Sequence, residues 1–267
     1  MQDWHERAAE EVVAVLDATE AAVTVQVQTP PASVFVGVPH YGSLVPEVLR
    51  SIMTASTEAQ VHVTTNGASL LAHNFNILWC SALNKRAESN LTHFAMHHAD
   101  ILAEACWLDK LLEEMRRVEA DVISVVVPIK DSRGLTSTGM QDPQTMNIRR
   151  LTMAEIMDLP VTFDAEDTRK FWEDDNPRWL MVNTGLFLVD FTKPWVEESY
   201  FEIRDAIRRG EDGRFSAHVL SEDWHWSGML ARKGLRVFAT RAVHVVHYGR
   251  ADFHNNQVWG CATDPGG

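Results

Sequence analysis

Short apolar runs that alternate with helical segments constrain the fold of this chain more than any other feature. Residues 34–38 (VFVGV) form a β-branched run that Pro39 ends, which is typical of a buried strand. Residues 68–85 carry apolar side chains at helical spacing, and residues 122–127 (VISVVV) are another β-branched run. Strands that alternate with helices predict an α/β fold, with a mostly parallel sheet between two layers of helices.

A further apolar run ends in polar groups that can bind a metal ion. Residues 91–96 lead directly into His97, His98 and Asp100. In open α/β sheets, ligands bind at the carboxyl ends of the strands. His98 and Asp100 are two residues apart, so on an extended backbone they share one face and can hold one cation, whereas His97 points to the opposite face. The alternative is a strand that simply reaches solvent, with these side chains capping the segment that follows.

The length of 267 residues allows one large α/β domain or two small ones, with a substantial core. Residues 1–30 predict an amphipathic helix and a linker, which we expect to pack on the main domain. Prolines 30 and 31 mark the end of this leader. We expect one main domain at 31–255 and a C-terminal tail at 256–267.

The net charge of −13 argues against broad electrostatic capture of nucleic acid. No apolar run is long enough to span a membrane, and the first residues lack a secretory pattern. Cys80, Cys106 and Cys261 show no paired spacing, which fits a reducing compartment. These features predict a cytoplasmic protein.

The second half of the chain alternates less clearly. Residues 130–139 are polar and interrupted by glycine, which is typical of a functional loop. The other expected elements are a bent strand or strand pair at 179–189, a helix at 194–209, a helix that begins after Ser221, and closing strands at 235–239 and 242–246.

Five landmarks follow one another along the chain: residues 36–42 (VGVPHYG), 98–100 (HAD), 183–185 (NTG), 221–223 (SED) and 245–249 (VVHYG). In this order they resemble a nucleotide-sugar glycosyltransferase of the GT-A fold, in the style of the family 2 glycosyltransferases. The resemblance implies a Rossmann-like, mixed but mostly parallel sheet flanked by helices, in a single domain. The loop 133–138 (RGLTST) also resembles small GT-A proteins encoded in phage genomes, which would place the protein in the host cytoplasm. For such proteins a hydroxymethylated DNA base is one candidate acceptor.

The resemblance implies a divalent cation that neutralises the diphosphate leaving group. The candidate ligands are Asp100, His98 and His247. Because His98 replaces the first aspartate of the family's Asp-x-Asp motif, Mn²⁺ suits this set better than Mg²⁺, which is the alternative. A metal-free enzyme also stays open at this stage.

Inverting transfer needs a carboxylate that deprotonates the acceptor hydroxyl as it attacks the anomeric carbon. The resemblance makes Asp223 the candidate base, with Glu222 next. A serine followed by two acids is also the ordinary pattern of a helix N-terminus, so a purely structural role is an equal interpretation of these residues.

The resemblance also implies contacts with donor and acceptor. Residues 65–67 (TNG) stand where relatives carry an acid that grips the nucleobase, and His73 stands where they carry an arginine. The donor-binding candidates are Pro39, His40, Tyr41, Gly42, Asn66, His73, His98, Asp100, Lys130 and Arg133. The acceptor-binding candidates are Asn183, Thr184, Gly185, Trp224 and Trp226. The alternative for residues 183–185 is an ordinary tight bend, and the alternative for the two tryptophans is a position in the core.

We therefore expect a glycosyltransferase that uses a nucleotide-sugar donor and a glycan, small molecule, protein or modified DNA base as acceptor. A nucleotidyltransferase is a second class, disfavoured because no glycine-rich basic phosphate loop follows the first strand. A non-catalytic sugar or nucleotide binder is a third class, which the missing first aspartate favours. The sequence does not indicate the oligomeric state.

Overall fold

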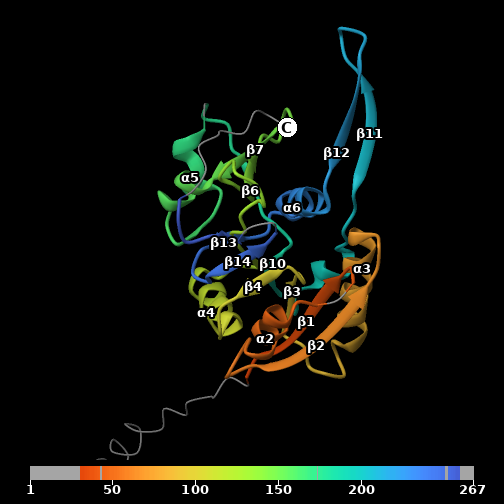
Figure 1. Ribbon diagram of the computed structural model, residues 1–267, viewed down its shortest axis with the longest axis vertical. Coiled ribbons are helices and arrows are strands. Elements are labelled where there is room, and N and C mark those ends of the chain that lie inside the picture. Colours follow the sequence, from red (N-terminus) through yellow and green to blue (C-terminus); the bar gives the residue numbers. More distant parts are fainter. Residues whose placement is uncertain (1–30, 43, 173, 250–251, 259–267) are drawn as a thin grey trace, which may run out of the picture. The chain divides into compact units, whose positions relative to one another are not determined.

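The centre of the protein is a seven-stranded sheet with the strand order β2-β1-β3-β10-β5-β13-β8. The computed structural model describes residues 31–42, 44–172, 174–249 and 252–258 (Figure 1). The predicted helix at 1–30 lies outside these residues, as does most of the predicted tail. The sheet strands are β1 (Ser33–His40), β2 (Gln60–Gly67), β3 (His93–His97), β5 (Val122–Val125), β8 (Thr162–Phe163), β10 (Leu186–Asp190) and β13 (Val237–Thr240).

The sheet is mixed but mostly parallel. Strand β1 pairs in parallel with both β2 and β3, and β5 pairs in parallel with β13. Strand β10 lies antiparallel between β3 and β5, and β8 is antiparallel at the edge. Five strands thus run in one direction, and the predicted fold class is confirmed.

The sheet has an apolar layer on each of its two faces, because successive residues of a strand point to opposite faces. Val34, Val36 and Val38 of β1 belong to one buried cluster, and Phe35 belongs to the other. Both clusters also draw on helices: α3 (Leu71–Lys85) and α6 (Glu222–Arg232) supply the layer of Phe35, while α2 (Pro46–Met53) and α4 (Trp107–Val118) supply the layer of Val34. None of the described helices is long and apolar enough to cross a membrane.

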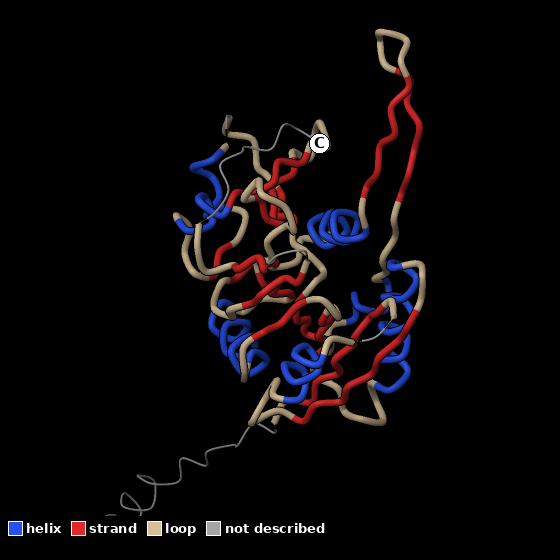
Figure 2. The backbone as a smooth tube through the Cα atoms, viewed as in Figure 1, coloured by secondary structure: helices blue, strands red, loops and turns tan. Residues whose placement is uncertain are grey.

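Smaller sheets complete the architecture (Figure 2). Strand β14 lies between β4 and β15, and β6 lies between β7 and β9. From Ala32 onward, the residues that the structure describes form one compact unit. The remaining elements are β4 (Ile101–Ala103), β6 (Leu135–Gln141), β7 (Ile148–Thr152), α5 (Met153–Met157), η1 (Glu166–Phe171), β9 (Trp179–Met181), η2 (Pro194–Glu198), β11 (Arg204–Arg209), β12 (Phe215–Leu220), β14 (Val245–Tyr248) and β15 (Asp252–His254).

Two expectations from the sequence were wrong. The stretch 194–209 is not one helix: a short 3₁₀ turn, η2, is followed by strand β11, which pairs with β12. The polar stretch 130–139 is a loop only at its start, because β6 begins at Leu135 and pairs with β7 and β9. In both places pairing with another strand decides the local structure, and local periodicity does not reveal it.

Candidate functional site

The carboxyl ends of β1 and β2 lie side by side and carry predicted donor-binding residues. Pro39 pairs with Asn66, and His40 pairs with Gly67, in the register of the two strands. Asn66 donates from Nδ2 to Oδ1 of Asn74 at 2.7 Å, and Asn74 donates back to the Asn66 carbonyl at 3.0 Å. A Cβ atom at Gly67 would lie 2.9 Å from His40 Cε1, so glycine makes room for the imidazole. These contacts fix the end of the sheet against the first turn of α3.

The chain turns sharply after β1 and exposes Tyr41. Gly42 has a φ of +91°, which glycine adopts without strain, and its carbonyl lies 2.7 Å from His40 Nδ1. Tyr41 is 85% exposed, and His73 is exposed on the first turn of α3. Both rings are therefore accessible to a ligand from solvent.

The Asp100 carboxylate lies just beyond the end of β3 and has two basic neighbours. Lys130 Nζ lies 2.5 Å from Oδ2, and His247 Nε2 lies 3.4 Å from the same oxygen. The Pro128 carbonyl accepts a hydrogen bond from His247 Nδ1 at 2.8 Å, which directs Nε2 toward the carboxylate. Burial raises the pKa of Asp100, but the contacts with His247 and Lys130 outweigh burial and hold this pKa below its usual value. The carboxylate is therefore ionised at neutral pH.

His98 presents a buried, neutral imidazole close to Asp100 in the chain. Its backbone N–H donates to the Gly185 carbonyl at 2.8 Å, and its ring packs on Phe75 with centroids 5.0 Å apart. Burial lowers the pKa of His98 to about 4. Its Nε2 atom is buried and has no hydrogen-bond partner among the described residues. A neutral imidazole nitrogen without a partner is suited to bind a cation or a ligand.

His97 faces the other side of the sheet, as its position in the strand predicted. Its ring is fully buried, with Nε2 3.3 Å from Ser51 Oγ and Nδ1 3.0 Å from the His98 carbonyl. It packs against Trp107 with ring centroids 5.3 Å apart. His97 therefore belongs to the core and supports the turn that carries His98.

The predicted metal ligands come together only in part. Asp100 contacts His247, and the charges of both affect the pKa of His98. Within the described ranges, however, no three His, Cys, Asp or Glu side chains are arranged to hold a metal ion. One carboxylate and two imidazoles suit a divalent cation by their chemistry. Because the Lys130 ammonium contacts Oδ2 of this carboxylate, a metal ion that binds the same oxygen would have to displace Lys130.

Arg133, the other basic residue among the donor-binding candidates, has a local partner. Arg133 donates to Asp131 Oδ2 from Nε at 2.9 Å and from Nη2 at 2.8 Å. The pKa of Asp131 lies below its usual value because Arg133 donates hydrogen bonds to this carboxylate. Lys130 and Arg133 thus each pair with an aspartate within or next to the candidate site.

Residues 183–185 form a tight bend between β9 and β10. Asn183 donates from Nδ2 to the Val125 carbonyl and accepts from the Gly185 N–H at 2.9 Å. A Cβ atom at Gly185 would lie 2.6 Å from Ile101 Cδ1. Asn183 and Thr184 are both buried, so their side chains stabilise the bend, and the Gly185 carbonyl holds His98.

Two carboxyl groups with raised pKa values begin α6. Burial and the neighbouring charge of Asp223 raise the pKa of Glu222 to about 7. Burial also raises the pKa of Asp223, although Ser221 Oγ and the Trp224 N–H donate to its Oδ1. Asp223, not Ser221, accepts the hydrogen bonds at this helix start, and the Ser221 side chain forms no cap. A carboxyl group with a pKa near 7 can exchange a proton at neutral pH.

The two tryptophans of α6 have different surroundings. Trp226 is fully buried, donates to Ser199 Oγ at 3.1 Å and packs on Phe187 with centroids 4.6 Å apart, so its ring is a core element. Trp224 is 7% exposed, and the Arg150 guanidinium lies over its ring at 4.7 Å. Arg150 was not predicted to belong to the site, and the basic pair Arg149-Arg150 is its only local signal in the sequence.

Backbone and aromatic contacts connect α6 to the end of β3. Ser227 Oγ accepts from the Val182 N–H and donates to the Val182 carbonyl, both at 3.0 Å, which joins α6 to the bend that holds His98. A row of ring contacts gives a second connection, from Trp226 through Phe201 and Phe75 to His98. The bend and this row fix the start of α6 relative to His98.

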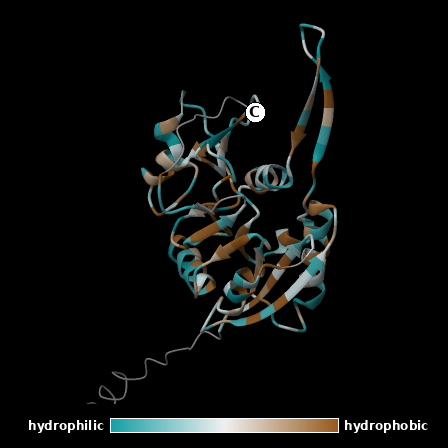
Figure 3. Cartoon of the chain, in the orientation of Figure 1, coloured by the Kyte–Doolittle hydropathy of each residue, from teal (hydrophilic) through white to brown (hydrophobic). Residues whose placement is uncertain are grey.

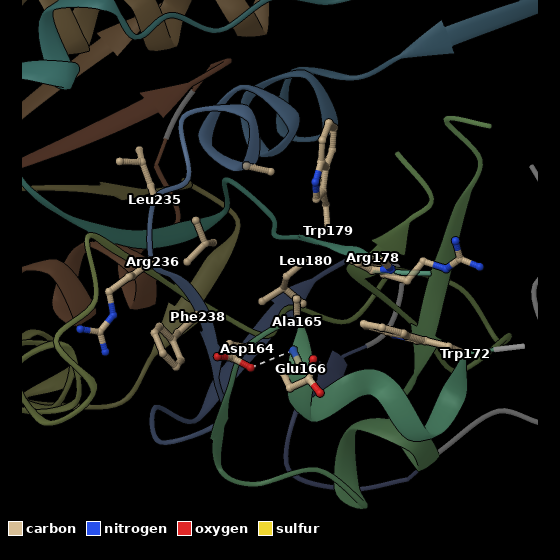
Figure 4. Close-up of a pocket in the computed structure, with 13 residues that line it drawn as sticks. Asp164, Ala165, Glu166, Trp172, Arg178, Trp179, Leu180, Leu235, Arg236 and Phe238 are labelled. Atoms are coloured by element: carbon tan, nitrogen blue, oxygen red, sulfur yellow. Dashed lines mark hydrogen bonds between the residues drawn. The ribbon is translucent and has the colours of Figure 1, made fainter. Parts of the chain in front are cut away.

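A pocket of about 420 Å³ opens between η1, β9 and the chain before β13 (Figure 4). None of the residues predicted for the site is among those that line it. Its polar groups are engaged with one another or with neighbours: Asp164 accepts from the Glu166 N–H at 2.9 Å, and Arg178 pairs with Asp142 and Asp174. The pocket is therefore not part of the candidate site.

No protein-family model and no curated protein matches this chain. Among solved structures, the fold is similar to the crystal structure of A197 from STIV, with a TM-score of 0.51 and 12% identity over 88% of this chain and 96% of that one. GalNAc-T7, crystallised with UDP, GalNAc and Mn²⁺, aligns with a TM-score of 0.47 and 14% identity over 84% of this chain and 45% of that one. At these identities the likeness concerns the fold alone. The fold is GT-A-like, as the sequence resemblance implied.

Proposed function

We propose that this protein transfers a sugar from a nucleotide-sugar donor to an acceptor hydroxyl. The observation that carries the proposal is the cluster of Asp100, Lys130, His247 and His98 beyond the carboxyl end of β3. Nucleotides bind at this edge in open α/β sheets. In this cluster Lys130 supplies positive charge and the two histidines supply hydrogen-bonding groups, both of which a diphosphate leaving group needs.

In the proposed reaction, the acceptor oxygen forms a bond to the anomeric carbon while the bond from that carbon to the diphosphate breaks. The acceptor proton passes to Asp223, with Glu222 as the alternative base, and the nucleoside diphosphate leaves with the electron pair of the broken bond. Burial raises the pKa of both carboxyl groups, that of Glu222 to about 7. A raised pKa supports this role because it makes a carboxylate a stronger base. Attack from the face opposite the leaving group gives inversion.

Donor binding is assigned to the ends of β1 and β2 and to the loop after β5. His40 and Asn66 are fixed there, and Tyr41 is exposed above them. After its ammonium group leaves Asp100, Lys130 would bind a phosphate oxygen of the donor. On the acceptor side, Trp224 with Arg150 over its ring is a more suitable contact than the fully buried Trp226.

Asp100, His98 and His247 are the residues that would hold a divalent cation, with Mn²⁺ preferred over Mg²⁺ because two of the ligands are imidazoles. When bound, such a cation would neutralise charge on the diphosphate. Lys130 supplies positive charge at the same carboxylate, so the metal and Lys130 are expected to compete.

The proposal is tested by thermal unfolding with a panel of nucleotide sugars, each in the presence of Mn²⁺, Mg²⁺ or EDTA. A donor at roughly 100 times its Kd should raise the melting temperature by about 5 °C, because it binds only the folded state. Asp100→Asn should lose the metal-dependent part of this shift. Glu113→Gln, which removes an exposed carboxylate on α4, is the matched control and should keep it.

If no nucleotide sugar shifts the melting temperature of the unaltered protein, the proposal fails. A shift without any turnover would favour a non-catalytic binder instead, and release of pyrophosphate would favour a nucleotidyltransferase.

A further inference from the structure

Strands β11 and β12 form an isolated two-stranded arm, residues 204–220, whose surface is almost entirely exposed. Among the described strands, each of the two pairs only with the other. Every residue of β11 is exposed, and so is every residue of β12 except Leu220 (Figures 1 and 2). A lone hairpin is marginally stable in water, and both of its outer edges present unpaired backbone groups. Both outer edges of the arm are therefore open to pairing with another strand.

One face of the arm is apolar. Ile207 lies opposite Ala217, and Phe215 and Val219 fall on the same face because residues two apart in a strand share a side. Ile207 is 78% exposed, Phe215 72% and Val219 66%. Along β12, apolar residues alternate with polar ones from Phe215 to Val219, and Figure 3 shows both hydrophobic and hydrophilic segments on the arm. This is the pattern of a sheet with one buried face, although nothing in the described part of the chain covers it.

Strand β11 also carries a self-complementary charge pattern. Asp205, Ile207 and Arg209 follow one another on the apolar face, with opposite charges placed symmetrically about Ile207. None of the described residues forms an ion pair with Asp205. Arg209 donates from Nε to the Gly213 carbonyl at 3.1 Å and lies over the Phe215 ring, which holds its guanidinium on this face.

We propose that the arm is a dimerisation element, and that β11 pairs antiparallel with β11 of a second copy of this chain. A two-fold axis through Ile207 places Asp205 of one copy opposite Arg209 of the other, twice, with the two Ile207 side chains between them. Opposite charges directly across an antiparallel pair stabilise it, and like charges destabilise it. The product is a four-stranded sheet in which the charge pairs and the two Ile207 side chains lie between the apolar side chains of the two β12 strands, and it meets the size that a stable sheet needs.

The charge pattern favours a second copy over a different protein. A two-fold contact joins the same patch on both subunits, so the patch must be complementary to itself. Asp205 and Arg209 meet this condition about Ile207. A strand that binds an unrelated edge has no need for such symmetry.

The test is the mass of the full chain in solution, measured by sedimentation or native mass spectrometry. We expect a dimer of two 30.1 kDa chains. Asp205→Arg places two arginines opposite each other, and Arg209→Asp places two aspartates opposite each other, so each variant alone should dimerise roughly tenfold or more weakly. Mixing the two variants restores both opposite-charge pairs and should restore a heterodimer.

Arg208→Asp is the matched control, because it makes the same charge change on the other face and should leave the dimer intact. Circular dichroism of each variant checks that the arm change leaves the rest folded. A monomeric unaltered protein would overturn the proposal. So would variants that stay dimeric, or a mixture of Asp205→Arg and Arg209→Asp that stays monomeric.

Discussion

Lys130 and Asp100 decide the electrostatics of the candidate site. The Lys130 ammonium lies 2.5 Å from the carboxylate oxygen, and His247 approaches the same atom. Together they keep Asp100 ionised despite its partial burial, since the pKa of this carboxyl lies below its usual value. The site thus holds a positive charge of its own, that of Lys130, which the sequence predicted to contact the donor but not to pair with Asp100.

Replacing Lys130 by methionine should therefore expose Asp100 to metal ions. A hydrogen bond to a charged group contributes about 1.5–3 kcal/mol, so we expect Mn²⁺ to bind Lys130→Met roughly tenfold or more tightly. Titration calorimetry with MnCl₂ measures this directly. Arg133→Met, which removes a neighbouring cation paired with Asp131, should bind Mn²⁺ as the unaltered protein does. Equal Mn²⁺ affinity in Lys130→Met and the unaltered protein would contradict competition at Asp100.

Glu222 makes the stability of the protein depend on pH. Its pKa is about 7 when folded, against 4.5 for an ordinary glutamate. Between these values the folded state keeps a proton that the unfolded state releases, so the free energy of unfolding falls as the pH rises from about 4.5 to 7. Below pH 4.5 Glu222 does not change the free energy of unfolding, and above pH 7 it lowers this free energy by up to about 3 kcal/mol.

Glu222→Gln removes this loss, because glutamine carries no charge at any pH. Relative to the unaltered protein, the variant should gain stability between pH 5 and pH 8. Urea unfolding at both pH values measures the difference, with Glu113→Gln as the control that should show no such gain. Parallel pH dependence in Glu222→Gln and the unaltered protein would show that Glu222 is not the group responsible.

At the scale of elements, the bend between β9 and β10 connects the two halves of the candidate site. Its Gly185 carbonyl holds the His98 backbone, and Val182 next to it bonds to Ser227 of α6. Glycine is required at 185 because any side chain would collide with Ile101, the residue after Asp100.

Gly185→Ala should therefore lower the free energy of unfolding by roughly 1–3 kcal/mol, the usual cost of overpacking a core. Chemical unfolding measures this change. Adding Ile101→Val removes the Cδ1 atom that the new methyl group meets, so the double variant should recover part of the loss. If Ile101→Val brings no recovery, the collision is not the cause.

The elements also show how far the sequence alone predicts the structure. Strand β1, helix α3 and the bend at 183–185 were confirmed, because apolar periodicity and the residues that end each element are local signals. Strand β11 was mistaken for a helix, since only its pairing with β12, across a turn, makes it a strand. The Lys130–Asp100 pair joins residues 30 positions apart, and no local pattern predicts which carboxylate a loop lysine will meet.

At the scale of the whole molecule, one sheet carries the candidate donor site at its carboxyl edge, and the bend at 183–185 connects this edge to α6. The arm is a separate feature, because its dimer contacts use none of the residues assigned to donor or acceptor. Sugar transfer and dimerisation are therefore expected to be lost independently.

Release of nucleoside diphosphate from a nucleotide sugar is the measurement that bears most closely on sugar transfer by this protein. We expect release with at least one donor, and a rate that falls roughly 100-fold or more in Asp223→Asn while donor binding is kept, as removal of a general base predicts. Unchanged release in Asp223→Asn would return Asp223 to a helix-capping role. If the protein binds nucleotide sugars but releases no nucleoside diphosphate with any acceptor, it is not a sugar transferase.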